Sequence, residues 1–337
     1  MADPDSVRTL GERNLIPLQS LPGLVLVDRT SLPMLQRGLD ESAITYRAVA
    51  PLIHPSRLTT RDRGGVGKDL SEGWCLNFAV GCTHGCKFCY VDVINKLFAG
   101  GRFKNNAPAR REVQDKDWGE YFMVPENLDE AIEETPWERW AGKEVMLSSM
   151  HDPYLPELAP YARAILEHAL PAGVRFCVQT RSLLVTRDFD LMSQYAAQVR
   201  LQVSVATASV RLQRVIEPRV PTATRRFEVL RKAKAACLPT GIILAPIFPP
   251  VEVREDVTED LSSMADTLAT IRPDHIFGES LHPRGQNMRL IEEALGHPIA
   301  FPKSFDFHAG RAFRRALRSH KMEGTWWPDH RAPASAA

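Results

Sequence analysis

From residue 74 onward, short apolar runs alternate along the chain with amphipathic stretches of helical length. Short apolar runs predict buried strands, and the longer stretches between them predict helices. This alternation is typical of β/α units, which build a parallel sheet. The pattern therefore predicts an α/β fold with six β/α units, too few for a closed eight-unit barrel. The expected strands cover residues 75–80, 144–149, 175–180, 201–206, 241–247 and 275–278.

Three of the intervening stretches carry helix signals. Residues 156–170 open with proline and glutamate, which are favourable in a first helical turn. Thr224 is the expected N-cap of a helix over residues 225–237, and Thr258 opens a helix that ends near Ile271. Each predicted helix is followed by the next apolar run, as β/α units require.

The rest of the chain flanks this repeating region. The expected parts are a loop-rich N-terminal extension (1–73), a catalytic barrel (74–300), a C-terminal helical extension (301–330) and a disordered tail (331–337). Trp326 and Trp327 stand just before the tail, and two roles are open for them. They either dock the C-terminus or line a pocket.

Composition agrees with an intracellular enzyme. The chain has 337 residues, of which 44% are hydrophobic and 25% charged, enough for one large core or two modest ones. No stretch approaches the ~18 consecutive apolar residues of a membrane span, and the polar start lacks the regions of a signal peptide. Six cysteines, three of them clustered, do not form a secreted disulfide framework. We therefore expect a cytoplasmic protein without membrane contact.

The net charge of +1 argues against a strongly basic duplex binder. Local basic clusters nevertheless occur, and the second recurs at three- and four-residue spacing, which draws one stripe on a helix. This stripe is either a solvated helix face or a contact for a phosphorylated substrate. The clusters are Arg102, Lys104, Arg110 and Arg111, and then Arg311, Arg314, Arg315, Arg318 and Lys321.

Three cysteines, Cys82, Cys86 and Cys89, form a C-x3-C-x2-C run just after the first predicted strand. In parallel β/α folds, chemistry gathers where strands end. Iron-sulfur clusters are held by thiolates, and a four-iron cluster with three thiolates keeps one iron open. A structural zinc site is the alternative, but zinc sites more often come as two separated pairs, and no second pair follows. The run predicts a [4Fe-4S] cluster.

This spacing, with Phe88 just before the third cysteine, resembles the signature of the radical S-adenosylmethionine (SAM) enzymes. The resemblance implies a partial (β/α)6 barrel of TIM type, with SAM bound to the open iron. It also implies that an electron from the cluster cleaves SAM to a 5'-deoxyadenosyl radical, which abstracts hydrogen from substrate. A reduced flavodoxin or ferredoxin is then the expected electron donor.

Beyond the cysteines, the chain resembles the branch of this family around spore photoproduct lyase. The segments that carry the resemblance are 77–90, Asp152-Pro153-Tyr154, 179–182, Arg187-Asp188, Glu217-Pro218-Arg219 and 245–249. Residue by residue, the resemblance implies the roles that follow. Phe88 packs along the adenine of SAM, and Ala245 lies beside the adenine. Ser148 and Ser204 contact SAM, and Arg181 pairs with its carboxylate through a two-pronged hydrogen bond. Ser149 and Tyr90 belong to the catalytic site.

Four of these polar residues have other readings. Tyr90 either borders the site or starts the following helix, and Ser204 either holds SAM or is a buried strand serine with a main-chain partner. Asp152 either caps the helix near residue 156 or binds a substrate hydroxyl. Glu217 either reaches a ribose or the amine of SAM, or lies in a surface turn.

Spore photoproduct lyase returns hydrogen from a cysteine near the end of the second barrel strand, but here no cysteine occurs between Cys89 and Cys177. Cys75 is the best remaining donor, with a core role as the alternative. We therefore expect a radical SAM enzyme of lyase or oxidoreductase type that acts on a nucleotide or nucleoside-like substrate by dehydration, deoxygenation or rearrangement. The alternatives are repair of a pyrimidine photoproduct in DNA, which makes nucleic acid a partner, and a non-catalytic zinc-binding protein.

Overall fold

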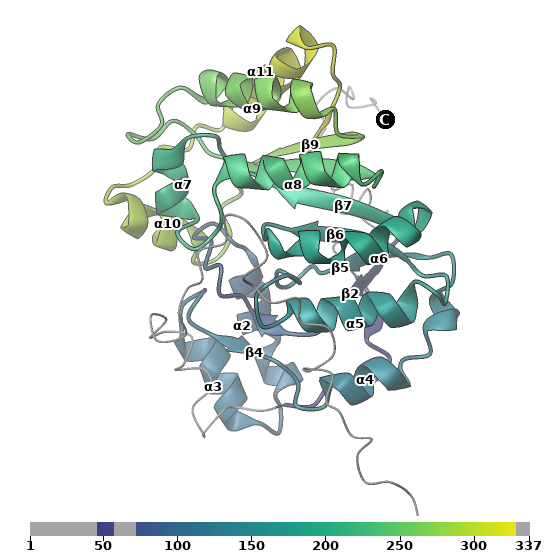
Figure 1. Ribbon diagram of the computed structural model, residues 1–337. Coiled ribbons are helices and arrows are strands. Elements are labelled where there is room, and N and C mark those ends of the chain that lie inside the picture. The colour runs from purple at the N-terminus through teal and green to yellow at the C-terminus, as the bar shows by residue number, and fades with distance from the viewer. Residues whose placement is uncertain (1–45, 57–71, 328–337) are drawn as a thin grey trace, which may run out of the picture. The chain divides into compact units, whose positions relative to one another are not determined.

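A sheet with the strand order β1-β2-β5-β6-β7-β8-β9-β10 runs through the part of the chain that the computed structural model describes, residues 46–56 and 72–327 (Figure 1). Strands β2 and β5 to β10 are parallel, and β1 is antiparallel to β2. The strands are β1 Ile53–Pro55, β2 Trp74–Leu76, β5 Glu144–Leu147, β6 Arg175–Thr180, β7 Val199–Ser204, β8 Thr240–Ile247, β9 His275–Ser280 and β10 Thr325–Trp327.

The six predicted strands correspond to β2 and β5 to β9, which confirms the α/β prediction. The first apolar run is divided, however, because β2 ends at Leu76 and a short β3, Val80–Gly81, pairs instead with β4, Phe122–Met123. Gly81 has a φ of +88°, and a Cβ there would lie 2.2 Å from the carbonyl oxygen of Tyr121. Only glycine permits this close crossing, which turns the chain away from the main sheet.

Each predicted extension adds an edge strand to the sheet, β1 from the N-terminal side and β10 from the C-terminal side. Trp326 on β10 is 1% exposed and packs over Gly278 and Gly310, where any Cβ would collide with its ring. Trp326 therefore docks the C-terminal segment, whereas the half-buried Trp327 packs against the inner wall of the barrel. The predicted disordered tail lies outside the described residues.

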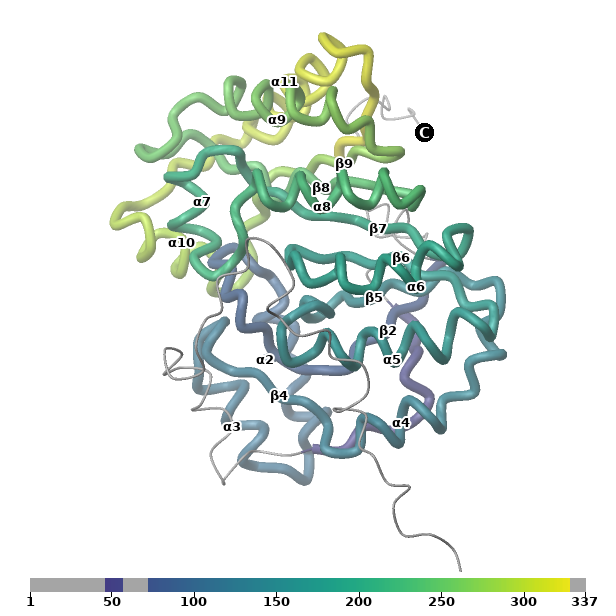
Figure 2. Tube along the Cα trace, in the orientation of Figure 1, coloured from purple at the N-terminus to yellow at the C-terminus, as the bar shows by residue number. Residues whose placement is uncertain are grey.

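The helices cover the outer face of the sheet; α8 packs on β7 and β8, and α9 and α11 lie side by side (Figure 2). Thr222 caps α8, so the predicted N-cap Thr224 is wrong by two residues. Asp256 caps α9, which begins one residue before the predicted Thr258. The helices are α2 Val91–Arg102, α3 Ala107–Asp115, α4 Leu128–Glu134, α5 Ala159–Ala169, α6 Phe189–Gln194, α7 Val210–Ile216, α8 Ala223–Ala235, α9 Val257–Ile271, α10 Asn287–Leu295 and α11 Phe305–Ser319.

The inner face of the sheet is set by the period of two along each strand. Cys75, Met146 and Cys177 are neighbours across β2, β5 and β6. Together with Ile243 and Phe277 they form a buried cluster inside the barrel. The carboxyl ends of these strands carry the candidate site.

Among the described residues, none of the helices combines the length and the apolar character that a bilayer crossing needs.

Candidate cluster and cofactor site

The three clustered cysteines lie on the loop between β3 and α2, at the carboxyl edge of the sheet. Two tight turns shape the loop, because the amide of Gly85 donates to the carbonyl of Cys82 at 3.3 Å and that of Cys89 to Cys86 at 3.1 Å. Arg219 fixes it from outside by donating to the carbonyl of Thr83 at 3.2 Å. Cys82 and Cys86 are buried and Cys89 is half-buried.

Burial raises the pKa of all three thiols, that of Cys82 and of Cys89 to about 12 and that of Cys86 further. A metal group must therefore displace their protons to bind. Their surroundings are apolar, because Cys86 and Cys89 pack with Phe88 and Phe248. Soft thiolates in a dry loop fit the chemistry of an iron-sulfur cluster. No three His, Cys, Asp or Glu side chains in the described segments converge as ligands of one metal ion.

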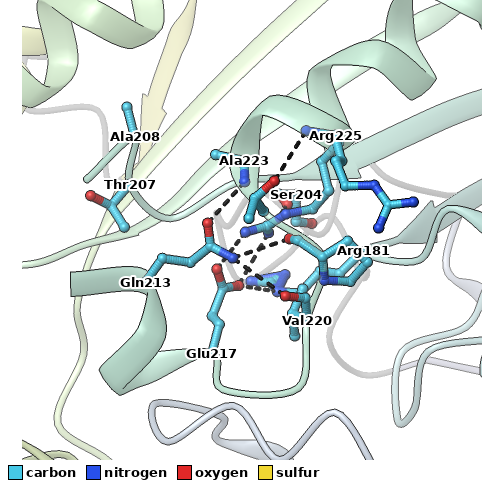
Figure 3. Close-up of polar contacts among 12 residues, drawn as sticks. Arg181, Ser204, Thr207, Ala208, Gln213, Glu217, Val220, Ala223 and Arg225 are labelled. Carbon is cyan, nitrogen blue, oxygen red and sulfur yellow. Dashed lines mark hydrogen bonds and ion pairs between the residues drawn. The ribbon is translucent and has the colours of Figure 1, made fainter. Parts of the chain in front are cut away.

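Arg181 contacts both Phe88, on the cysteine loop, and Ala245, and all three are residues that the resemblance assigns to SAM binding. The guanidinium of Arg181 lies 5.2 Å from the ring centroid of Phe88, within cation–π range. It also donates from Nη2 to the carbonyl of Ala245 at 3.1 Å and from Nε to Glu217 Oε1 at 3.0 Å (Figure 3). An arginine has five N–H donors, so these two bonds leave three for a ligand.

Glu217 is buried, not part of a surface turn, and that alternative is wrong. Its carboxylate accepts bonds from Arg181 and from both Nη atoms of Arg226, whose side chain is fully buried. Arg226 also donates to the main-chain carbonyl of Ser204. Two cations thus share the carboxylate of Glu217, and the carboxylate of Asp152 also acts on Arg181. Gln213 supports the loop that carries Glu217 by bonding Pro221 and Ala223 (Figure 3).

Ser204 is buried, and its hydroxyl accepts a long 3.5 Å bond from Gln179 Nε2. The partner found for this hydroxyl is a side chain and not the main-chain group that the alternative reading foresaw, and the hydroxyl faces the barrel interior together with Gln179. Both roles for this serine therefore stay open.

Asp152 joins the cysteine loop to the sheet and does not cap α5, which begins only at Ala159. Its carboxylate receives bonds from His84 Nε2 at 3.1 Å, Thr180 Oγ1 at 2.6 Å and the amide of Arg181 at 2.7 Å. Burial alone would raise the pKa of Asp152, but the facing His84 and the hydrogen bonds lower it to about 2. The predicted capping role is wrong, because the N-cap of α5 is Leu158. The one local bond of this carboxylate, from the amide of Tyr154 at 2.9 Å, lies in the turn before the helix.

Cys75 and Ser149 are brought together by Asn77. Asn77 Nδ2 lies 3.5 Å from Cys75 Sγ and 3.1 Å from Ser149 Oγ, and its Oδ1 accepts from the amide of Ser149 at 2.9 Å. Burial raises the pKa of Cys75, so it remains a thiol at neutral pH. Ser148 and Ser149 follow the end of β5 at Leu147, and the hydroxyl of Ser148 donates to the carbonyl of His151 at 2.7 Å.

Tyr90 stands directly before α2, at the junction of the cysteine loop and the helix. Arg284 lies over its ring at 5.5 Å from the centroid. Asn287 ties the loop of Arg284 to the cysteine loop by donating to the carbonyls of Phe88 at 3.2 Å and His282 at 3.0 Å. Tyr90 therefore starts the helix and follows Cys89 directly, and its place in the catalytic site stays a prediction.

Arg226 and Asn77 are the residues that sequence reasoning missed. Arg226 belongs to an Arg-Arg pair on a helix, which looks like an exposed basic face. It nevertheless recurs with the buried Ala223, Phe227 and Leu230 at three- and four-residue spacing, and a charged residue on such an apolar stripe signals a buried partner.

A mostly parallel β/α sheet with a three-cysteine loop at its carboxyl edge defines an α/β protein of the partial-barrel class. Residues 76–263, more than half of the chain, match the family model of the radical SAM superfamily. The chain belongs to this superfamily, whose enzymes use a [4Fe-4S] cluster and SAM.

The chain is also similar to two uncharacterised proteins and, in fold, to a solved structure. An uncharacterised protein of Acidianus two-tailed virus, ORF301, is 53% identical over 84% of this chain and 91% of its own length. An uncharacterised protein of Methanocaldococcus jannaschii is 25% identical over 52% of this chain and 61% of its own. A solved structure of a spore photoproduct lyase variant shares the fold, with a TM-score of 0.57 at 14% identity over 84% of this chain and 79% of that one.

Proposed function

We propose that Cys82, Cys86 and Cys89 bind three irons of a [4Fe-4S] cluster and that the enzyme acts on a nucleotide or nucleoside-like substrate. When bound, the cluster supplies the electron that cleaves SAM and so provides a hydrogen-abstracting radical. The observation that carries the proposal is the three-thiol loop beside an arginine with donors to spare. The non-catalytic zinc-binding alternative lacks a second ligand pair.

The protein's own residues would bind and orient SAM. Glu217 and Ala245 anchor Arg181 on one side, so its remaining N–H groups are held in a fixed direction. These groups would bind the carboxylate of SAM. Phe88 offers an apolar surface for the adenine, and Ser204 and Ser148 offer polar contacts. The guanidinium of Arg181, which Glu217 holds in place, would supply the positive charge for an anionic ligand.

The substrate class is supported by two observations. Structures of spore photoproduct lyase that match this fold contain a dinucleoside spore photoproduct, and one also contains SAM. The inner wall of the barrel combines an apolar cluster with polar side chains such as Gln179 and Ser204, which suits a nucleoside. Dehydration, deoxygenation or rearrangement is the proposed reaction, with reduced flavodoxin or ferredoxin as electron donor and the cytoplasm as a suitably reducing location.

Repair of a pyrimidine photoproduct is the second candidate, and Cys75 favours it. This thiol lines the barrel interior, keeps its proton, and is linked through Asn77 to Ser149. Cys75 is the thiol best placed to return hydrogen to a product radical, and Tyr90 is the other candidate donor.

Deuterium transfer tests the choice of substrate. The reconstituted enzyme is supplied with SAM, reductant and either deuterated free nucleotides or irradiated, deuterated oligonucleotides. Deuterium in 5'-deoxyadenosine from free nucleotides supports the proposal. Transfer from irradiated oligonucleotides alone would replace it with the repair function.

A further inference from the structure

We propose that the outer face of α11 binds a single-stranded nucleic acid. Phe307, Arg311, Arg315 and Arg318 recur at spacings of four, four and three residues, so they lie on one face of this helix. All four are exposed, and Phe307 is 47% exposed, which is unusual for a large apolar side chain. These residues are called the α11 stripe below.

The charges of the α11 stripe are not neutralised. Among the residues that the structure describes, Arg311, Arg315 and Arg318 have no acidic partner, and the contact found for Arg311 is with the ring of Phe307, at 5.7 Å from its centroid. Some exposed arginines on other helices are paired, as Arg231 is with Glu228 and Arg289 with Glu293. The α11 stripe differs from other exposed arginines in setting three of them in one row with an exposed aromatic ring. The one acidic residue of α11, Asp306, is bonded to Ser280 and Trp326.

The opposite face of α11 fixes the stripe in place. Phe305, Phe313 and Leu317 are buried, and the helix packs on α9 and β9. Asp306 accepts a hydrogen bond from Ser280, the last residue of β9, so the first turn of α11 lies at the carboxyl edge of the sheet, where the cysteine loop also lies. From Phe307 to Arg318 the stripe extends about 17 Å along the helix.

The arginines and the aromatic ring of the α11 stripe suit a single-stranded nucleic acid. Arginines bind phosphates through paired N–H donors, and three of them in a row suit a chain of phosphates better than a single one. An exposed aromatic ring among them offers a stacking surface for an unpaired base, which a duplex does not present. A strand along the stripe would lead toward the edge of the sheet that carries the cysteine loop.

Fluorescence anisotropy with the full chain tests this inference without the cluster. The probe is a labelled thymidine oligonucleotide of about 12 nucleotides, titrated between about 50 and 200 mM salt. The triple variant Arg311→Gln, Arg315→Gln, Arg318→Gln should bind at least about tenfold more weakly at low salt, with a salt slope lower by about 2. A triple Arg211→Gln, Arg214→Gln, Arg225→Gln removes the same charge from exposed positions of α7 and α8 and should change affinity less than about twofold.

Phe307→Ala separates stacking from charge. It should weaken binding of the single strand at least about fivefold and leave binding of the matching duplex unchanged. A uridine oligoribonucleotide in the same assay tells RNA from DNA as the preferred strand. Equal losses in both arginine triples, or tighter binding to the duplex or to phosphatidylserine vesicles than to the single strand, would overturn the inference.

Discussion

Arg226 and Glu217 form a fully buried ion pair in which both Nη atoms of the arginine bind the carboxylate. The same carboxylate holds Nε of Arg181 at 3.0 Å. Glu217 thus links Arg226, a buried residue of α8, to Arg181, which lies beside the cysteine loop. Arg226 is a positioning residue, because its contacts within the described segments reach the proposed SAM pocket through Glu217 and the carbonyl of Ser204.

Arg226→Met should destabilise the protein by about 3 kcal/mol or more, because it leaves a buried carboxylate with one cation in place of two. The neighbouring Arg225 is exposed, so Arg225→Met should change the free energy of unfolding by less than about 0.5 kcal/mol. Urea unfolding of both variants measures the difference. A loss below about 1 kcal/mol for Arg226→Met would show that the pair is not a structural support.

Arg181→Met should weaken SAM binding at least about tenfold, because a charge-assisted hydrogen bond to the ligand is lost. Arg181→Lys keeps the charge but lacks the forked donors, so its affinity should lie between those of the wild type and Arg181→Met. Equilibrium dialysis of SAM with the reconstituted protein measures this. Arg231→Met, on the surface of α8, serves as control, and equal affinities for all four proteins would remove Arg181 from the SAM site.

Asp152 makes stability depend on pH in the acid range. Its folded-state pKa of about 2 lies below the ordinary 3.8, so the carboxylate stabilises the fold above about pH 4, and this contribution is lost as the pH falls toward about 2. Asp152→Asn should therefore cost about 2 kcal/mol at neutral pH, and less below about pH 3. Urea unfolding at several pH values measures the difference in unfolding free energy between the wild type and Asp152→Asn, with the exposed Asp115→Asn as control. A difference that does not change with pH would contradict this account.

Cys75→Ala should leave SAM cleavage within about twofold of the wild type while lowering product formed per 5'-deoxyadenosine at least about tenfold. The reason is that a buried thiol with a raised pKa keeps the hydrogen that a product radical needs. Cys177→Ala is a matched control on the same inner wall, two strands away. Mass spectrometry quantifies 5'-deoxyadenosine and the product formed from the substrate. An equal ratio of the two in both variants would mean that Cys75 is not the hydrogen donor.

The central strands were predictable because each is a continuous apolar run whose burial is a local property of the sequence. The edge strands β1 and β10 were not, since each has three residues and forms only by pairing with a neighbour. The cysteine loop was equally predictable, because its ligand spacing is local. The capping role of Asp152 and the surface turn of Glu217 were wrong for the opposite reason. Their partners, His84, Arg181 and Arg226, are supplied by the tertiary fold, and local turn chemistry does not reveal them.

The most direct test of the central claim is reductive SAM cleavage by the wild type and by the triple variant Cys82→Ala, Cys86→Ala, Cys89→Ala. After anaerobic reconstitution, the wild type should hold about four irons and four sulfides per chain and release 5'-deoxyadenosine when reduced with SAM present. The triple variant should keep its secondary structure by circular dichroism but hold no cluster and form no 5'-deoxyadenosine. SAM cleavage by the triple variant at the wild-type rate would contradict the assignment of these cysteines.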